Sequence, residues 1–257
     1  MAGKQLKSFT RAHVARIPFE ITNLERAAHF VLDAAASKHA TSFRLVNAYC
    51  VAVAEGDKDY LSLLRGPGYN FPDGTPVAWA MRRHAPPGIQ PQRVRGPSLF
   101  ASVLEMGQRE NTTHFFLGTT EPTLSAMCAE LRVRYPNLKI AGTYAPPFGP
   151  LDDEFYQAAI SKIQTKRPDI VWVALGSPKQ DFASLELARR TGLPCIGVGA
   201  AFDFAAGTAS EAPKWVQDSG VEWLFRFATE PQRLWRRYVF GNLKFARSVL
   251  VHWKYKP

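Results

Sequence analysis

The sequence predicts an α/β fold in which helices cover both faces of a parallel sheet and a helical appendage follows. Two observations predict the sheet. The candidate strands are continuous apolar runs rather than alternating ones, and helical segments separate them. This combination is typical of a Rossmann-like parallel sheet that is buried on both faces. A change of composition after about residue 212 predicts the appendage.

The expected elements alternate along the chain. Residues 1–20 are expected to form a basic arm that leads into a strand or loop, and residues 22–38 a helix. A strand from Ser42 then ends in a loop at Asn47 before further helix toward Leu64. Later strands are expected at 114–117, 138–141, 170–175 and within 193–204. Helices are expected between them at 121–135, 155–166 and 182–190.

Length and composition are typical of a globular chain. The 257 residues suit one large domain or one domain with an appendage, and we assign 1–212 to the core and 213–257 to the appendage. Apolar residues make up 46%, enough for a core, and 21% charged residues argue against disorder. No apolar run of about 18 residues occurs, so no membrane span is expected.

Charge and cysteines narrow the choice of partners and compartment. A net charge of +10 favours an anionic partner, namely nucleic acid, a phosphorylated substrate or an anionic membrane. The three cysteines, Cys50, Cys128 and Cys195, are widely spaced and show no metal-ligand spacing. We expect buried thiols in a reducing compartment.

Ligands of open parallel sheets bind at the carboxyl ends of the strands. The loops expected there carry Asn47 and glycines at 118–120, 142–144, 176–180 and 197–199. Such loops favour a nucleotide or nucleotide sugar, although a single glycine after a strand more often marks a tight turn. GxxxxGK[ST] is absent and GVGAAF has only two of the three glycines of GxGxxG, so neither a P-loop nor a dinucleotide site is favoured.

Two acidic clusters raise the question of a metal site. Asp57-Lys58-Asp59 has the D-x-D form, and residues 152–154 are Asp-Asp-Glu. We interpret the first as part of a surface helix and the second as the acidic first turn of a helix, which the helix dipole favours. Neither is predicted to bind a metal.

Four motifs together distinguish this chain from a generic α/β protein: PDG at 72–74, GSPKQD at 176–181, GVGAAFDFAAG at 197–207 and EWLFRFATEPQRLWRRY at 222–238. With Asn47, they resemble the WecG/TagA/CpsF family of bacterial glycosyltransferases from about Asn47 to Tyr238. The resemblance implies a Rossmann-like core with a helical appendage and an inverting transfer without cofactor or metal. The donor would be a UDP-sugar and the acceptor a sugar on undecaprenyl diphosphate, in cell-surface or exopolysaccharide synthesis.

The resemblance also assigns roles to residues. Asp73 matches the aspartate of PDG, the family's proposed general base, which would take the proton of the attacking hydroxyl; the alternative is an Asp-Gly turn residue. For the residues matched to substrate binding, a turn or capping role is the alternative: Asn47, Arg93, Gly142, Tyr144, Lys179, Gln180 and Asp203. Leu45 and Ser98 stand where the family usually has Thr and Asp.

The appendage is basic and aromatic. Residues 214–257 hold nine Lys/Arg against three Asp/Glu, and four of the six tryptophans. By the resemblance, four arginines would hold the leaving diphosphate, and no metal would be needed: Arg226, Arg233, Arg236 and Arg237. Leu234, Tyr238 and Phe245 follow a helical stripe, which indicates either docking on the anionic inner face of the cell membrane or packing on the chain's own core.

The expected protein is therefore a cytoplasmic enzyme that associates peripherally with the membrane. The sequence does not determine the oligomeric state, and a homo-oligomer is one of the possibilities. Two alternatives remain, a basic nucleic-acid-binding protein and a nucleotide-cofactor oxidoreductase. The absence of a recognisable nucleic-acid-binding motif argues against the first.

Overall fold

The computed structural model describes residues 9–213, 215–216, 222–229, 231–252 and 255. The chain folds into two compact units. The first contains Leu24–Arg44 and Gly96–Ala209, and the second contains Phe9–Asn23, Leu45–Arg95 and the chain from Ser210 onward. The predicted division into a core of residues 1–212 and an appendage of 213–257 differs from these two units and stays a prediction.

A six-stranded parallel sheet has the order β4-β3-β8-β7-β5-β6. This confirms the predicted α/β class and the parallel sheet. All the side chains of β3 and β7 are buried; β7 is apolar throughout, whereas β3 also buries Ser42 and Arg44. The strands are β3 (Ser42–Val46), β4 (Tyr69–Pro72), β5 (Thr113–Gly118), β6 (Lys139–Tyr144), β7 (Ile170–Ala174) and β8 (Cys195–Gly197).

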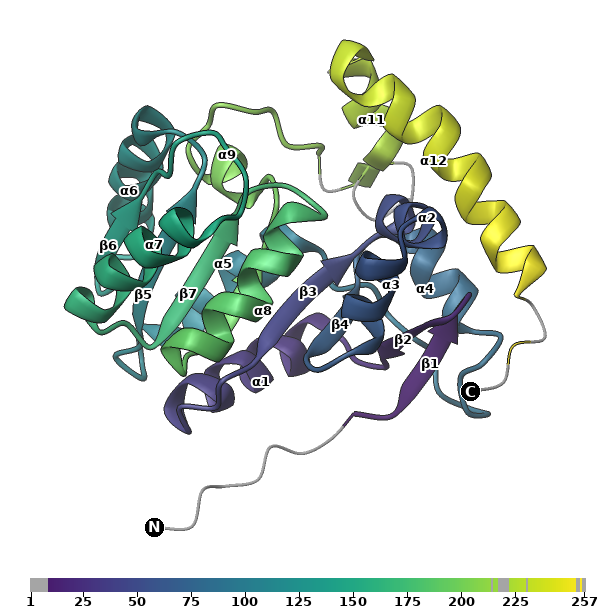
Figure 1. Cartoon of the computed structure of the whole chain (residues 1–257), viewed down its shortest axis with the longest axis horizontal. Helices are drawn as coiled ribbons and strands as arrows, with labels where there is room; N and C mark the ends of the chain where they lie inside the picture. The colour runs from purple at the N-terminus through teal and green to yellow at the C-terminus, as the bar shows by residue number, and fades with distance from the viewer. Residues whose placement is uncertain (1–8, 214, 217–221, 230, 253–254, 256–257) are drawn as a thin grey trace. The chain divides into compact units, whose positions relative to one another are not determined.

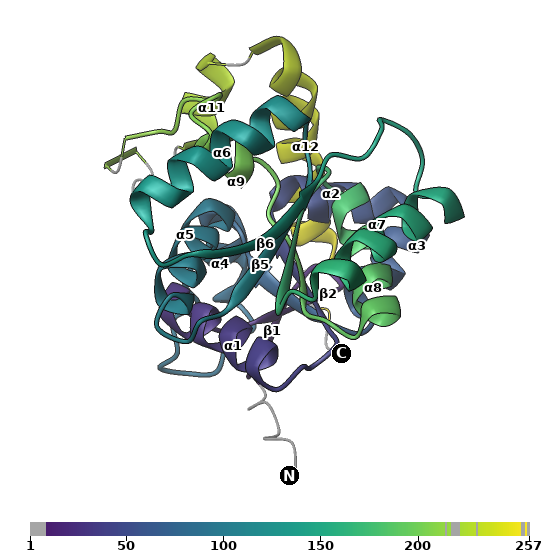
Figure 2. The same cartoon turned by 90° about the vertical axis from the view of Figure 1, so that its left-hand side faces the viewer.

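Helices cover both faces of the sheet in the first unit, and Figure 2 shows α6 and α7 on opposite sides of β5 and β6. Alternate residues of β5 divide between the faces: Phe115 joins the core under α7 and α8, whereas Phe116 packs on Phe100 and Phe202. Because both faces of such a strand are buried, its sequence does not alternate between apolar and polar residues. The helices are α1 (Leu24–Ala36), α5 (Gly96–Gly107), α6 (Glu121–Arg134), α7 (Asp153–Lys166), α8 (Lys179–Thr191) and α9 (Ala201–Ala205).

The second unit contains the antiparallel hairpin of β1 (Arg11–Val14) and β2 (Ile17–Glu20). Its long C-terminal helix α12 lies alongside α2 (Figure 1). The other helices of the unit are short. The helices are α2 (Ala48–Gly56), α3 (Lys58–Arg65), α4 (Thr75–Met81), α11 (Glu222–Thr229) and α12 (Pro231–Val251).

Both acidic clusters lie at helix starts. The Asp57 carboxylate caps α3 by accepting from the Tyr60 amide at 2.9 Å, and Asp152 caps α7 by accepting from the Phe155 amide at 2.9 Å. Side-chain oxygens at this position satisfy amides that have no partner within the helix. The interpretation of these clusters as helix-associated carboxylates is confirmed, with Asp57 at the junction of α2 and α3 rather than inside one helix.

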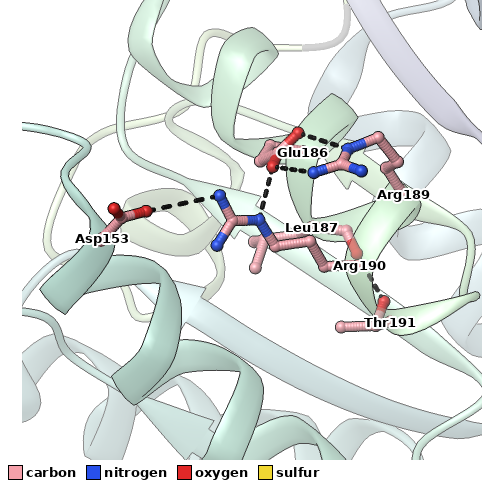
Figure 3. Close-up of polar contacts among 6 residues, drawn as sticks. All are labelled: Asp153, Glu186, Leu187, Arg189, Arg190 and Thr191. Atoms are coloured by element: carbon pink, nitrogen blue, oxygen red, sulfur yellow. Dashed lines mark hydrogen bonds and ion pairs between the residues drawn. The ribbon is translucent and has the colours of Figure 1, made fainter.

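An ion network links the end of α8 to the start of α7 (Figure 3). The Glu186 carboxylate accepts from Arg189 Nε at 2.9 Å and Nη2 at 2.7 Å, and also from Arg190 Nε. Arg190 Nη2 lies 3.5 Å from the Asp153 carboxylate on α7. The hydrogen bonds from Arg189 outweigh the effect of burial and lower the pKa of Glu186 to about 2.

Replacing Glu186 by Gln is expected to lower the free energy of unfolding at pH 7 by about 1 kcal/mol, a value kept small because Arg189 is largely exposed. The folded-state pKa lies below the usual 4.5, so this stabilisation is present above pH 4.5 and is lost as the pH falls toward 2. Urea denaturation at pH 7 and pH 3 should therefore show a smaller difference between variant and wild type at the lower pH. Glu130→Gln, an exposed change on α6, is the control; an equal loss in both variants would contradict the prediction.

Candidate active site

Three predicted site residues converge in the second unit at the ends of β3 and β4. Asp73 follows β4, and its amide donates to the carbonyl of Val46, the last residue of β3, at 3.0 Å. Asn47 follows Val46 directly. The Val94 amide donates to the Pro72 carbonyl at 2.7 Å, which holds the neighbouring Arg93 beside the same strand end. We call Asn47, Asp73 and Arg93 the Asp73 cluster.

All three side chains of the Asp73 cluster are half-buried, so a ligand can reach them. Asp73 is followed by Gly74, which has a φ of 91° and turns the chain from β4 into α4. A residue with a side chain rarely adopts this φ, which explains why a glycine follows the carboxylate. Asp73 thus lies at a strand-to-helix turn, and its catalytic role stays a prediction.

Asn47 has a local structural role. Its side-chain oxygen accepts from the Cys50 amide at 3.2 Å and caps α2. Asn47 therefore has the helix-capping role that the sequence analysis gave as the alternative to substrate binding. Among the residues that the structure describes, none accepts from its amide nitrogen, so two donors remain for a ligand. Leu45, two residues earlier, is buried in β3 with 4% of its surface exposed.

Other predicted site residues lie in the first unit around the start of α8. Gln180 is only 2% exposed, and its side-chain oxygen accepts from the Gly199 amide at 3.0 Å. Its amide nitrogen lies 3.3 Å from the Ser177 hydroxyl. Gln180 thereby connects the loop after β7 to the loop after β8, so its side chain shapes two strand-end loops. Its predicted contact with substrate stays a prediction.

Lys179 holds the loop between β6 and α7. Its ammonium donates to the Gly149 carbonyl and lies 5.7 Å from the centre of the Phe148 ring. The Phe148 side chain is fully exposed. Lys179 is thus tied to this loop, and whether it also meets a ligand stays a prediction.

The structure differs from the sequence prediction at Gly142 and Tyr144. Both belong to β6, which extends to Tyr144 rather than ending at residue 141. A side chain at Gly142 would place its Cβ 3.0 Å from the Phe115 ring, so the glycine lets the strand pack closely. The Tyr144 ring lies 5.1 Å from the Lys162 ammonium, at the carboxyl end of the strand. The loop assignment was wrong; the substrate roles of both residues stay predictions.

Asp203 lies in α9, directly after the loop that follows β8. Its backbone carbonyl accepts from the Thr208 hydroxyl at 3.1 Å, and its side chain is half-buried. Asp203 is thus an acidic residue in the first turn of a helix that follows a strand-end loop. Its contact with a nucleotide stays a prediction.

The arginines of the appendage lie on α11 and α12, but their side chains are outside the described part of the structure: Arg226, Arg233, Arg236 and Arg237. The backbone nevertheless constrains where the last two lie. Gly241 of α12 packs on Tyr49 of α2, where an added Cβ would lie 3.4 Å from the ring. The turn with Arg236 and Arg237 comes just before Gly241, and Tyr49 comes two residues after Asn47 of the Asp73 cluster.

The sequence analysis missed two sets of polar contacts that fasten the C-terminal part of the chain within the second unit. Arg95, 6% exposed, binds the carboxylate of Glu211, which lies just before the appendage. Glu55 on α2 accepts from Ser248 at 2.9 Å and lies 3.2 Å from His252 Nε2. The partners are more than 100 residues apart in sequence, and no local pattern relates them.

In the described residues, no helix is long and apolar enough to cross a membrane. The model of the glycosyl transferase WecG/TagA/CpsF family matches residues 12–257, which include both units and the appendage. The match covers every residue of the Asp73 cluster, the surroundings of Gln180, and α11 and α12. The chain therefore belongs to the WecG/TagA/CpsF family of glycosyl transferases, which functions in cell-surface polysaccharide synthesis.

Proposed function

We propose that this glycosyltransferase moves a hexose-type sugar from a UDP-sugar to a sugar on a polyprenyl diphosphate, with inversion at the anomeric carbon. The observation that carries the proposal is the convergence of Asn47, Asp73 and Arg93 at two adjacent strand ends. Strand ends are where open parallel sheets bind ligands. The carboxylate can act as a base, the amide can hydrogen-bond a sugar hydroxyl, and the guanidinium can bind an anion.

Asp73 is the base in this proposal. Its carboxylate accepts the proton of the acceptor hydroxyl while the hydroxyl oxygen bonds to the anomeric carbon and the bond from that carbon to UDP breaks. Attack opposite the leaving group inverts the configuration, so one carboxylate is enough. The amide of Asn47 holds a sugar hydroxyl, and Arg93 meets a phosphate oxygen.

The leaving UDP needs compensation of its charge. Arg226, Arg233, Arg236 and Arg237 belong to the two appendage helices, and their guanidinium groups are assigned to the diphosphate oxygens. Lys179, Gln180, Tyr144, Gly142 and Asp203 are assigned to the nucleotide-sugar side of the reaction. Arginine forks bind phosphate oxygens in pairs, so they supply the neutralisation that a divalent ion supplies in other transferases.

The appendage is also assigned to the inner membrane surface, where a lipid-linked acceptor lies. Support comes from large apolar side chains of α12 that are more than half exposed, and from two exposed cations on the same helix. Such a helix is suited to an anionic interface. The apolar residues are Phe240, Leu243, Leu250 and Val251, and the cations are Lys244 and Arg247.

The test is transfer from a panel of radiolabelled UDP-sugars to a sugar on a short-chain lipid diphosphate. One donor should give a product that is one sugar larger, and NMR of its new linkage should show the inverted anomeric configuration. Absence of turnover with every UDP-sugar would overturn the donor assignment, and a retained configuration would overturn the single-base mechanism. Bound nucleic acid or a bound nicotinamide or flavin in the purified protein would favour the alternative functions instead.

A further inference from the structure

A groove of about 610 Å³ lies between α2 and α12 in the second unit. This volume is within the usual range for small-molecule sites, about 300–1,000 Å³. On the α2 side, the groove is lined by residues from Tyr49 to Asp57, two to ten residues after Asn47. None of the three residues of the Asp73 cluster lines it, whereas Phe240, Lys244, Arg247 and Val251, assigned above to the membrane surface, do.

The groove is held open by fixed contacts at its two ends. At one end, Gly241 lets α12 approach the Tyr49 ring of α2. At the other end, Glu55 accepts from Ser248, which is 2% exposed, and lies against His252. Next to Glu55, Gly56 has no atom within 4 Å of where a Cβ would be, which leaves space in the groove wall.

The wall is apolar but carries two cations. Ala52 and Val53 of α2 face Phe240 and Val251 of α12 across the groove. Lys244 and Arg247 line it as well, three residues apart and therefore neighbours on one helix face. Within the described part of the chain, neither cation has a carboxylate partner.

The two carboxylates of the groove are already engaged. Asp57 caps α3 through the Tyr60 amide at 2.9 Å. Glu55 has Arg16 Nη2 at 3.5 Å in addition to Ser248 and His252. Burial raises the pKa of Glu55, but the hydrogen bonds from His252 and Ser248 and the charge of Arg16 outweigh it, so the pKa lies below its usual value. Both carboxylates thus already accept hydrogen bonds within the protein, whereas Lys244 and Arg247 remain available to an anionic ligand.

We propose that this groove binds one molecule of an anionic membrane glycerophospholipid, with an acyl chain between Val53 and Phe240 and the phosphate on Lys244 and Arg247. An apolar channel next to paired cations matches a chain attached to a phosphate. Leu243 and Leu250, 66% and 69% exposed, are available to enter the bilayer beside it. The inference rests on the membrane association proposed above and adds a discrete, saturable lipid site to it.

The experiment measures binding of monomeric dihexanoyl phosphatidylglycerol to the full chain by calorimetry. Wild type should saturate at one lipid per chain, and inorganic phosphate alone should not compete. Val53→Trp, which fills the groove, should weaken binding at least about tenfold. Lys244→Gln/Arg247→Gln should weaken it about thirtyfold, since each cation near a lipid surface contributes about one kcal/mol. The control, Lys38→Gln/Arg109→Gln, removes two exposed cations of the first unit and should change the affinity less than about twofold.

Three outcomes would overturn the lipid site. An equal loss in the control pair would show unspecific charge attraction, and unchanged binding in both groove variants would place the lipid elsewhere. Stronger competition by geranyl diphosphate than by phosphatidylglycerol would make the groove a site for the isoprenoid acceptor. Transfer to a water-soluble acceptor is measured on the same wild-type preparation, so a failed lipid site and a failed transferase assignment give different results.

Discussion

Asp73→Asn is expected to lower kcat by about a thousandfold, the middle of the range for loss of a general base. Asparagine keeps the size of the side chain and the backbone contact of residue 73 with Val46, but it cannot accept the acceptor's proton. Binding of UDP, measured by calorimetry, should stay within about twofold because the base acts on the acceptor. Single-turnover kinetics with the best donor from the panel give the rate of the chemical step.

The matched control is Asp59→Asn on α3, an exposed carboxylate of the D-x-D sequence in the same unit. It should keep full activity, because Asp59 is an exposed residue in the first turn of α3 and has no role in the proposed reaction. A variant Asp73→Asn with more than a tenth of wild-type kcat would exclude Asp73 as the base. A large loss in Asp59→Asn would instead reopen the interpretation of that sequence as a metal site.

The fold was predictable from the sequence where burial leaves a pattern. Continuous apolar runs predict β5 and β7 because both strands are buried on both faces. The sequence analysis missed β4 and α5, and it left the hairpin of β1 and β2 as an arm with a strand or loop. A four-residue strand is too short to show a period, and its pairing depends on partners that are distant in sequence.

The candidate site was predictable in part. Asp73 was identifiable from the PDG motif, and the structure places it between β4 and α4. Gln180 also belongs to a motif. Its hydrogen bond to the Gly199 amide was not identifiable from the sequence, because the two residues are 19 positions apart. His114 had no sequence signal at all: it is fully buried, accepts from Trp172 Nε1 at 3.1 Å, and burial lowers its pKa to about 4. Such contacts follow from tertiary packing, which a single sequence does not display.

Gly118→Ala is expected to prevent folding or to lower the free energy of unfolding by more than about 4 kcal/mol, a loss that needs a specific structural cause. Gly118 ends β5 opposite Ala174 of β7. A Cβ there would lie 2.3 Å from the Ala174 carbonyl oxygen and 2.6 Å from its carbon, both of which are backbone atoms. The φ of 129° adds strain for any side chain. The sequence explains this glycine as a turn or as a site of ligand approach, whereas the structure explains it by the contact between two central strands.

Gly192→Ala separates the two causes. Gly192 ends α8 with a φ of 76°, but no atom lies within 4 Å of the position of a Cβ. Its replacement should therefore cost only the conformational strain, about 1 kcal/mol. Urea denaturation of both variants measures the difference, which contains the cost of forcing β5 and β7 apart and the greater backbone strain at a φ of 129° than at 76°. A Gly118→Ala variant that is no less stable than Gly192→Ala would contradict this prediction. It would mean that β5 and β7 can separate locally where Gly118 meets Ala174, and that the strand ends before Thr119 and Leu175 can adapt.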